Sequence, residues 1–163
     1  MLRIVPLDPA HDRRTFTSGS EPLDRYLHQQ VTQDIRRRVT ACFVALEQQS
    51  QRIAGYYTLA SASIPLLDLP ADLAQRLPRY PSVPAVRLGR LAVDQVFQGR
   101  GVGGVLLADA LARALRADIA AYALVVDAKD ETAAAFYRHH GFIAFASQPR
   151  TLFLPLATVQ TLS

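Results

Sequence analysis

The sequence predicts an α/β fold in which helices flank a mixed sheet, and three observations support this. The 163 residues suffice for one compact domain with its own core. Segments with the apolar spacing of helices alternate with short runs rich in β-branched and aromatic residues. Within residues 86–115, a predicted strand, a glycine-rich turn and an apolar-striped helix follow one another. We therefore expect one domain over residues 1–163.

The first part of the chain predicts one helix followed by a strand hairpin. Apolar residues recur every three or four positions through residues 21–38, and Ser20 stands where an N-cap is expected. Residues 41–46 and 53–60 are rich in β-branched and aromatic residues and are separated by a polar turn. A third strand is expected near residues 61–65.

The second part of the chain predicts alternating strands and helices. Residues 69–77 indicate a short helix, and residues 78–84 a surface loop, because each proline removes a backbone donor. The strand at residues 86–93 precedes a helix with one apolar face, made of Val102, Leu106, Leu107, Ala110, Leu111 and Leu115. The remaining predicted elements are a strand at 123–126, a helix at 130–140 that stops at Gly141, and strands at 142–146 and 152–156.

Composition excludes several classes of protein. Half of the residues are apolar and only 8 are Gly and 10 Pro, which is typical of a folded globular chain. The single cysteine, Cys42, lies in an apolar run and excludes an intramolecular disulfide or a cysteine metal cluster. The N-terminal residues do not resemble a signal peptide, and no stretch approaches the ~20 apolar residues of a membrane span. We expect a cytoplasmic protein that does not enter a membrane.

The positive charge is carried almost entirely by arginine. Lys and Arg together number 18 against 14 Asp and Glu, for a net charge of +4, and Lys129 is the only lysine. Because a guanidinium can bind phosphate oxygens with two hydrogen bonds, this charge favours a nucleotide or nucleic-acid partner. A high-GC genome would produce the same bias, so composition alone leaves the partner open.

The glycine-rich turn after residue 98 indicates an anion-binding site. Glycines at positions 99, 101, 103 and 104 leave the backbone amides at the helix N-terminus accessible, where the helix dipole favours phosphate. The Gly-Lys-Ser/Thr sequence of a P-loop is missing, and the glycine spacing differs from that of a dinucleotide fingerprint.

The segment from Gln98 to Gly103 fits the pattern Gln/Arg-x-x-Gly-x-Gly/Ala, and Leu-Ala-Val-Asp precedes it. Some thirty residues later comes Asp130-x-x-Ala-x-x-Phe-Tyr-x-x-x-Gly-Phe142. In these three elements the chain resembles the GNAT acetyltransferase superfamily. The resemblance implies a GNAT-like domain with a mixed, mostly antiparallel central sheet flanked by helices, and acetyl-CoA as cosubstrate, with its pyrophosphate in the glycine loop.

A narrower resemblance covers nearly the whole chain. Residues 16–27, 53–60, 86–93 and 152–156 are similar to the GNAT toxins of bacterial toxin–antitoxin pairs. This resemblance implies acetylation of the amino group of aminoacyl-tRNA, which inhibits translation. It also implies a homodimer and a small ribbon-helix-helix antitoxin that holds the enzyme inactive.

The resemblance also assigns roles to individual residues. The backbone amide of Val93 would polarise the acetyl carbonyl, and the phenol of Tyr137 would act as general acid toward the departing thiolate. Asp130 stands where many family members carry Asn, which is a departure at a position expected to contact pantetheine. The complete set expected to bind acetyl-CoA is Leu91, Ala92, Val93, Gln98, Gly99, Arg100, Gly101, Val102, Gly103, Gly104, Asp130, Phe136 and Tyr137; no metal is expected.

Neither a carboxylate nor a histidine stands out as general base. An α-amino group has a reference pKa of about 7.7–8.0, so water can accept its proton. His139 and His140 are interpreted as residues of a helix end, where the dipole favours them.

Arginines are the candidates for contacting RNA. The set is Arg36, Arg37, Arg38, Arg87 and Arg90, with Arg76 and Arg79 near the proline-rich segment. Two other hypotheses stay open at this point. The acceptor is a small-molecule or protein amine, or the chain is a non-catalytic module that binds acetyl-CoA or nucleic acid.

Overall fold

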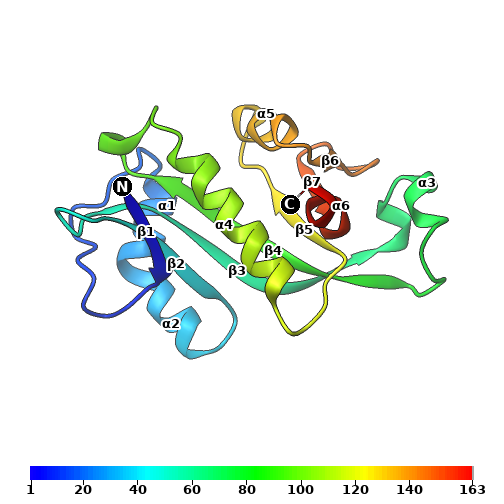
Figure 1. Ribbon diagram of the computed structural model, residues 1–163, viewed down its shortest axis with the longest axis horizontal. Helices are drawn as coiled ribbons and strands as arrows, with labels where there is room; N and C mark the ends of the chain where they lie inside the picture. Colours follow the sequence, from blue (N-terminus) through cyan, green and yellow to red (C-terminus); the bar gives the residue numbers. More distant parts are fainter. Residues whose placement is uncertain (163) are drawn as a thin grey trace. The chain divides into compact units, whose positions relative to one another are not determined.

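Within residues 1–162, seven strands form one sheet that is mixed, as the sequence predicts (Figure 1). The computed structural model describes residues 1–162. The strand order is β1-β2-β3-β4-β5-β7-β6. In chain order the strands are β1 (Leu2–Pro6), β2 (Ala41–Glu47), β3 (Ile53–Pro65), β4 (Ser82–Val93), β5 (Ala123–Asp127), β6 (Ile143–Ala144) and β7 (Thr151–Pro155).

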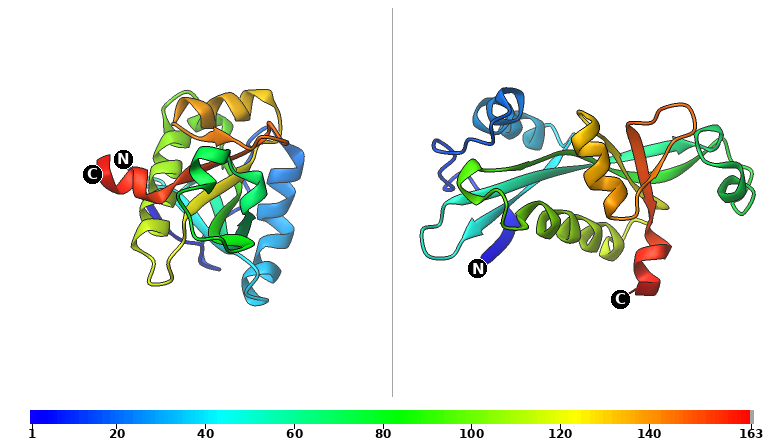
Figure 2. Two further views of the ribbon diagram at one scale, coloured as in Figure 1. Left: turned by 90° about the vertical axis from the view of Figure 1, so that its right-hand side faces the viewer. Right: turned by 90° about the horizontal axis from the view of Figure 1, so that it is seen from above.

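Helical segments connect these strands. The longest is α4, which follows the glycine-rich turn, and α6 continues directly from β7 at the red end of the chain in Figure 2. In chain order they are α1 (Glu21–Arg25), the π-helical turn η1 (Tyr26–Gln30), α2 (Val31–Arg36), the 3₁₀ turn η2 (Leu66–Asp68), α3 (Ala71–Ala74), the 3₁₀ turn η3 (Gln95–Phe97), α4 (Val102–Arg116), α5 (Glu131–His139) and α6 (Leu156–Leu162).

The chain divides into two compact units, and the first comprises Met1–Ala60 and Gly89–Ala110. In this unit β1 pairs with β2 and β2 pairs with β3, both antiparallel, which confirms the predicted hairpin. Its core includes Phe16, which contacts Tyr56 edge to face with ring centroids 5.6 Å apart. Cys42 is buried in the same core, as predicted for a residue in an apolar strand.

The second unit comprises Ser61–Leu88 and the chain from Leu111 onward. Here β4 pairs with β5 in parallel over Ala85–Leu88, while β7 pairs with both β5 and β6 in antiparallel register. The core of this unit gathers Ile64, Leu69, Val83, Ala85, Ala123, Val125, Phe145 and Phe153.

Several element boundaries differ from the prediction. The predicted end of the loop at residues 78–84 is wrong, because β4 already begins at Ser82 and includes Pro84. Pro84 is exposed and contributes its carbonyl, which accepts a 2.8 Å hydrogen bond from the amide of Tyr122. The strand expected near residues 61–65 is the continuation of β3, and the helix expected at 69–77 shortens to α3. Strand β1 and helix α6 were not predicted.

The helix predicted over residues 21–38 is interrupted and ends early. A π-helical turn, η1, separates α1 from α2, and α2 ends at Arg36. Arg38 takes a left-handed backbone conformation with φ 60°. Ser20 occupies the N-cap position as predicted, yet its side chain makes no capping hydrogen bond.

Gly55 in β3 permits close packing in the first unit. A Cβ atom at this position would lie 2.8 Å from Cδ1 of Leu106 and 2.9 Å from the carbonyl oxygen of Ala92. The latter atom belongs to the backbone of β4, so it cannot rotate away as a flexible side chain would. Gly55 therefore lets β3, β4 and α4 approach one another just before the glycine-rich turn.

We predict that Gly55→Ala lowers the free energy of unfolding by about 1–3 kcal/mol, because the added methyl group overpacks this contact. Gly89→Ala in β4 is the matched control, since its Cβ would meet only the hydroxyl of Thr58 at 3.0 Å. Urea unfolding of both variants measures the difference. Equal stability of Gly55→Ala and the wild type would contradict the prediction.

Candidate functional site

The C-terminal residues of β4 lie in the first unit. Their side chains are apolar, so their polar groups are those of the backbone. Ala92 is buried in the core, while Leu91 and Val93 are half-buried. The amide of the next residue, Asp94, donates a 2.8 Å hydrogen bond to the carbonyl of Ala54 in β3. The apolar side chains at these positions thus anchor the strand. Only the peptide groups of these three residues can form hydrogen bonds with a ligand.

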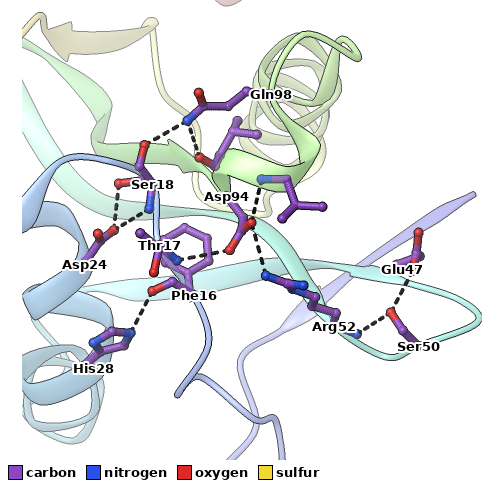
Figure 3. A network of polar contacts seen from close by, with 12 residues as sticks. Phe16, Thr17, Ser18, Asp24, His28, Glu47, Ser50, Arg52, Asp94 and Gln98 are labelled. Carbon is purple, nitrogen blue, oxygen red and sulfur yellow. Dashed lines mark hydrogen bonds and ion pairs between the residues drawn. The ribbon is translucent and has the colours of Figure 1, made fainter.

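Asp94 is a buried carboxylate that joins three segments of the first unit (Figure 3). Its exposed fraction is 1%, and its Oδ2 accepts a 3.0 Å hydrogen bond from the amide of Thr17. Oδ1 accepts a 2.9 Å hydrogen bond from the amide of Val96, and through this bond Asp94 caps η3. The same Oδ1 atom lies 3.5 Å from Nη2 of Arg52. Asp94 therefore connects the start of the loop to the segment before α1 and to the β2–β3 hairpin.

Gln98 closes the same loop with its side chain. Its Nε2 donates to the carbonyls of Ser18, at 2.8 Å, and of Val93, at 2.9 Å (Figure 3). Ser18 is held in turn by Asp24, whose Oδ1 accepts from the Ser18 amide and hydroxyl. The sequence placed Gln98 among the residues that bind acetyl-CoA, and the structure gives its amide nitrogen two backbone partners.

The glycine-rich turn follows this anchored segment. Gly99 and Gly101 adopt left-handed conformations, with φ 79° and 78°, and no atom lies within 4 Å of where their Cβ atoms would be. Helix α4 begins at Val102, which is buried, and its first turn contains no acidic residue. The first amides of a helix have no partner within the helix and carry the positive end of its dipole. These conformations leave room for an anionic group at residues 99–104, and anion binding there stays a prediction.

The predicted closing helix is α5, in the second unit. Tyr137 is 8% exposed and packs against Phe136 and Phe142. Burial raises the pKa of Tyr137 to about 12, so the phenol stays protonated at neutral pH. Among residues 1–162, the hydroxyl group of Tyr137 has no hydrogen-bond partner. It is therefore available to donate a proton or a hydrogen bond to another molecule.

Asp130 acts as the N-cap of α5. Its Oδ1 accepts a 2.8 Å hydrogen bond from the amide of Ala133, three residues later. A carboxylate at this position also complements the helix dipole. With Asp instead of Asn at position 130, the start of α5 is therefore still capped. At the other end of α5, His139 and His140 are exposed, as expected for residues of a helix end.

The candidate RNA-binding arginines have different surroundings. Arg36, Arg37 and Arg38 are exposed at the end of α2 in the first unit, whereas Arg76, Arg79 and Arg87 belong to the second. Arg87 forms an ion pair with Asp127, so much of its charge is compensated. The guanidinium carbon of Arg90 lies 3.5 Å from the centroid of the Tyr26 ring.

Asp94 and its partners, which hold the loop, are not among the residues predicted from the sequence. An aspartate before a short helical turn is a recognisable capping signal, so the bond from Asp94 to Val96 could have been predicted. The bonds to Thr17, Ser18 and Arg52 join residues far apart in the sequence, which no local pattern indicates.

We predict that Asp94→Ala lowers the free energy of unfolding by about 3 kcal/mol, because it leaves two backbone amides and a guanidinium without their buried acceptor. Asp12→Ala is the control, since Asp12 pairs with Arg14 on the surface and its removal should change the stability far less. Chemical unfolding of the two variants tests the difference. Similar losses would show that the buried network contributes little.

No helix within residues 1–162 is both long and apolar enough to cross a membrane, and no group of three or more potential metal ligands occurs in this range. A family model described as "Acetyltransferase (GNAT) domain" matches residues 17–151, which include parts of both units. It covers the anchored loop, α4 and α5.

Individual proteins match over almost the full length. A tRNA-acetylating toxin of Mycobacterium tuberculosis is 35% identical over 158 residues, which cover 96% of this chain and 93% of the toxin. The solved structure of AtaT complexed with acetyl-methionyl-tRNAfMet is 29% identical, with a TM-score of 0.92 and 99% coverage of both chains. Another structure, of a mutant AtaT toxin bound to the C-terminus of the antitoxin AtaR and acetyl-CoA, is 26% identical, with a TM-score of 0.82 and coverage of 99% and 97%. The chain therefore belongs to the GNAT acetyltransferase family.

Proposed function

We propose that this enzyme acetylates the amino group of aminoacyl-tRNA and thereby acts as a toxin that inhibits translation. The observation that carries the proposal is the full-length similarity to a protein named as a tRNA-acetylating toxin. AtaT, which is similar over 99% of this chain, was solved with acetyl-methionyl-tRNA. The net charge of +4, with exposed arginines at and just after the end of α2, fits a polyanionic acceptor.

In the proposed reaction the acceptor amine attacks the thioester carbonyl and loses a proton to water, the C–S bond breaks, and the thiolate takes a proton from Tyr137. The amide of Val93 donates a hydrogen bond to the carbonyl oxygen as negative charge develops on it. Leu91, Ala92 and Val93 pair through their backbone with the pantetheine arm. An α-amino group has a reference pKa of about 7.7–8.0, so a useful fraction is neutral near pH 7.5 and no dedicated base is needed.

The glycine-rich turn binds the pyrophosphate of acetyl-CoA in this proposal. Amides of Gly99–Gly104 surround the anion, and Arg100, whose guanidinium lies 5.6 Å from the Phe97 ring, adds positive charge. Gln98 supports this turn through its two backbone hydrogen bonds. On α5, Phe136 packs beside Tyr137 and Asp130 holds the helix start.

Tyr137 is the proposed general acid that protonates the departing thiolate. Its pKa of about 12 keeps the phenol protonated throughout the working pH range. The absence of a competing hydrogen-bond partner within residues 1–162 leaves the hydroxyl available for the sulfur.

RNA contacts are proposed at Arg90 and at the exposed Arg36, Arg37 and Arg38. Arg87 contributes less, because Asp127 already pairs with it.

We also propose that the two units act as one catalytic domain over residues 1–163, that the enzyme is a homodimer in the cytoplasm, and that a ribbon-helix-helix antitoxin inhibits it. The complex of AtaT with its antitoxin AtaR supports the existence of such a partner.

We predict that Gly101→Asp weakens acetyl-CoA binding at least tenfold more than Gly101→Asn does. Both side chains enter open space at a left-handed position that Asn and Asp tolerate best after glycine, so the comparison isolates the negative charge. Isothermal titration calorimetry with acetyl-CoA measures both affinities. Equal affinities would place the pyrophosphate away from this turn.

We predict that Tyr137→Phe lowers kcat about 100-fold with little change in the KM for acetyl-CoA, as expected for loss of a general acid. In the wild type, kcat should not fall between pH 8 and about pH 10, because a phenol with a pKa of about 12 is still protonated there. Tyr57→Phe, which removes another buried tyrosine hydroxyl, is the control and should retain activity. A wild-type activity loss centred near pH 9 would assign the acid to another group.

The acceptor is tested with purified enzyme and radiolabelled acetyl-CoA. We expect label on aminoacyl-tRNA and none on uncharged tRNA, and we expect induced expression of the wild type, but not of Tyr137→Phe, to stop translation. Faster labelling of polyamines or peptides than of aminoacyl-tRNA would overturn the proposed acceptor.

A further inference from the structure

A pocket of about 260 Å³ opens in the first unit beside the end of β4. Six residues line it: Pro22, Leu23, Arg25, Tyr26, Gln30 and Arg90. Arg90 precedes Val93 by three residues in the same strand, which corresponds to about 10 Å of backbone. The amine of an aminoacyl ester lies at a comparable distance from the 5′ phosphate of the nucleotide that carries it.

Arg90 lies against an aromatic ring that is itself fixed. Its guanidinium carbon is 3.5 Å from the centroid of Tyr26, the contact of a cation–π pair. Tyr26 is only 4% exposed, and its hydroxyl donates a 2.7 Å hydrogen bond to Oδ2 of Asp34. Burial and this hydrogen bond raise the pKa of Tyr26, so the phenol stays protonated and continues to donate.

The π-helical turn η1 accounts for the contact between Tyr26 and Asp34. Residues eight apart on a regular α-helix are separated by about 80° around the axis, too far for two side chains to meet. A π turn accommodates one extra residue, which reduces the separation to about 20°. The backbone amide of Val31 donates to the carbonyl of Tyr26 across this turn, and the two side chains lie on one face.

Arg90 supplies the uncompensated charge of the pocket. Within residues 1–162, no carboxylate lies within ion-pair distance of it. The nearby acidic groups are engaged elsewhere: Asp34 accepts from Tyr26, Asp24 accepts from Ser18, and Glu21 pairs with Arg25. With one face of its guanidinium on the Tyr26 ring, Arg90 retains its in-plane N–H donors for an oxyanion.

We infer that this pocket binds a backbone phosphate at the 3′ end of the RNA acceptor through Arg90, and that Tyr26 and Asp34 are positioning residues that hold the Arg90 guanidinium in place. The inference rests on the proposed function, since it concerns the same acceptor. A phosphodiester fits because a flat guanidinium offers it two parallel donors, and because the pocket is open on one side, as a continuous RNA chain requires.

A graded series of variants tests the roles. Arg90→Ala removes the cation, Tyr26→Leu removes the ring and its hydroxyl, and Tyr26→Phe keeps the ring but loses the bond to Asp34. We expect the KM for aminoacyl-tRNA to rise about tenfold for Arg90→Ala, nearly as much for Tyr26→Leu, and about threefold for Tyr26→Phe. The KM for acetyl-CoA and the kcat should stay close to wild type. Tyr57→Leu, which removes a buried ring of the same unit that stacks on Phe43, is the control.

Two further measurements separate positioning from general destabilisation. In the Arg90→Ala background, Tyr26→Leu should add no further rise in the KM for aminoacyl-tRNA, because its effect acts through Arg90. The dependence of that KM on salt concentration should weaken in Arg90→Ala by the equivalent of about one phosphate contact. Additive effects of the two substitutions, or an equal effect of Tyr57→Leu, would overturn the inference.

The outcomes also separate this inference from the proposed function. If the wild type does not acetylate aminoacyl-tRNA, both are overturned. If the wild type acetylates it while the Tyr26 variants keep the wild-type KM, only the phosphate subsite is overturned. A rise confined to the KM for acetyl-CoA would likewise assign the pocket to the cosubstrate and overturn the subsite.

Discussion

The buried carboxylate of Asp94 is the constraint on which the conformation of the loop before α4 depends. A charge that is 1% exposed requires hydrogen bonds, and this one receives them from the amides of Thr17 and Val96 and faces the guanidinium of Arg52. These partners come from three separate stretches of the chain. The loop therefore takes one conformation only when the segment before α1 and the β2–β3 hairpin are also in place. Gln98 adds two further bonds from the far side of the loop.

This arrangement assigns stability and chemistry to different groups. Side chains such as Ala92 and Val102 are buried and anchor the strand and the helix. The peptide groups next to them bind the cosubstrate in the proposed mechanism, and a peptide group is present whatever the residue. In the same proposal Tyr137 is the titratable side chain that serves the reaction, and it belongs to the second unit. The family pattern is accordingly short, with glycines and small apolar residues rather than a constellation of acids and bases.

Local patterns in the sequence predicted the elements that depend mainly on neighbouring residues, such as the two main helices and the glycine-rich turn. Apolar spacing located α4 and α5, and the glycines at 99 and 101 do adopt the left-handed conformations that only glycine enters without strain. Long-range contacts decided the rest. Pro84 enters a strand because only its carbonyl is needed there, and β1 is a strand because β2 offers it an antiparallel edge. The proposed roles of Tyr137 and Val93 came from family resemblance, because the side chains alone do not indicate these roles.

The π-helical turn at Tyr26–Gln30 has a consequence for how such enzymes diverge. A π turn differs from an α turn by a single inserted residue, so one codon gained or lost there rotates everything before it on the helix relative to everything after it. Leu27 within the turn and Val31 directly after it are buried core residues. Lineages can therefore change the face presented beside Arg90 in one genetic step, while the glycine turn and α5 keep their sequence. On the inference that Arg90 contacts the acceptor, contacts to the acceptor and to acetyl-CoA can therefore change independently.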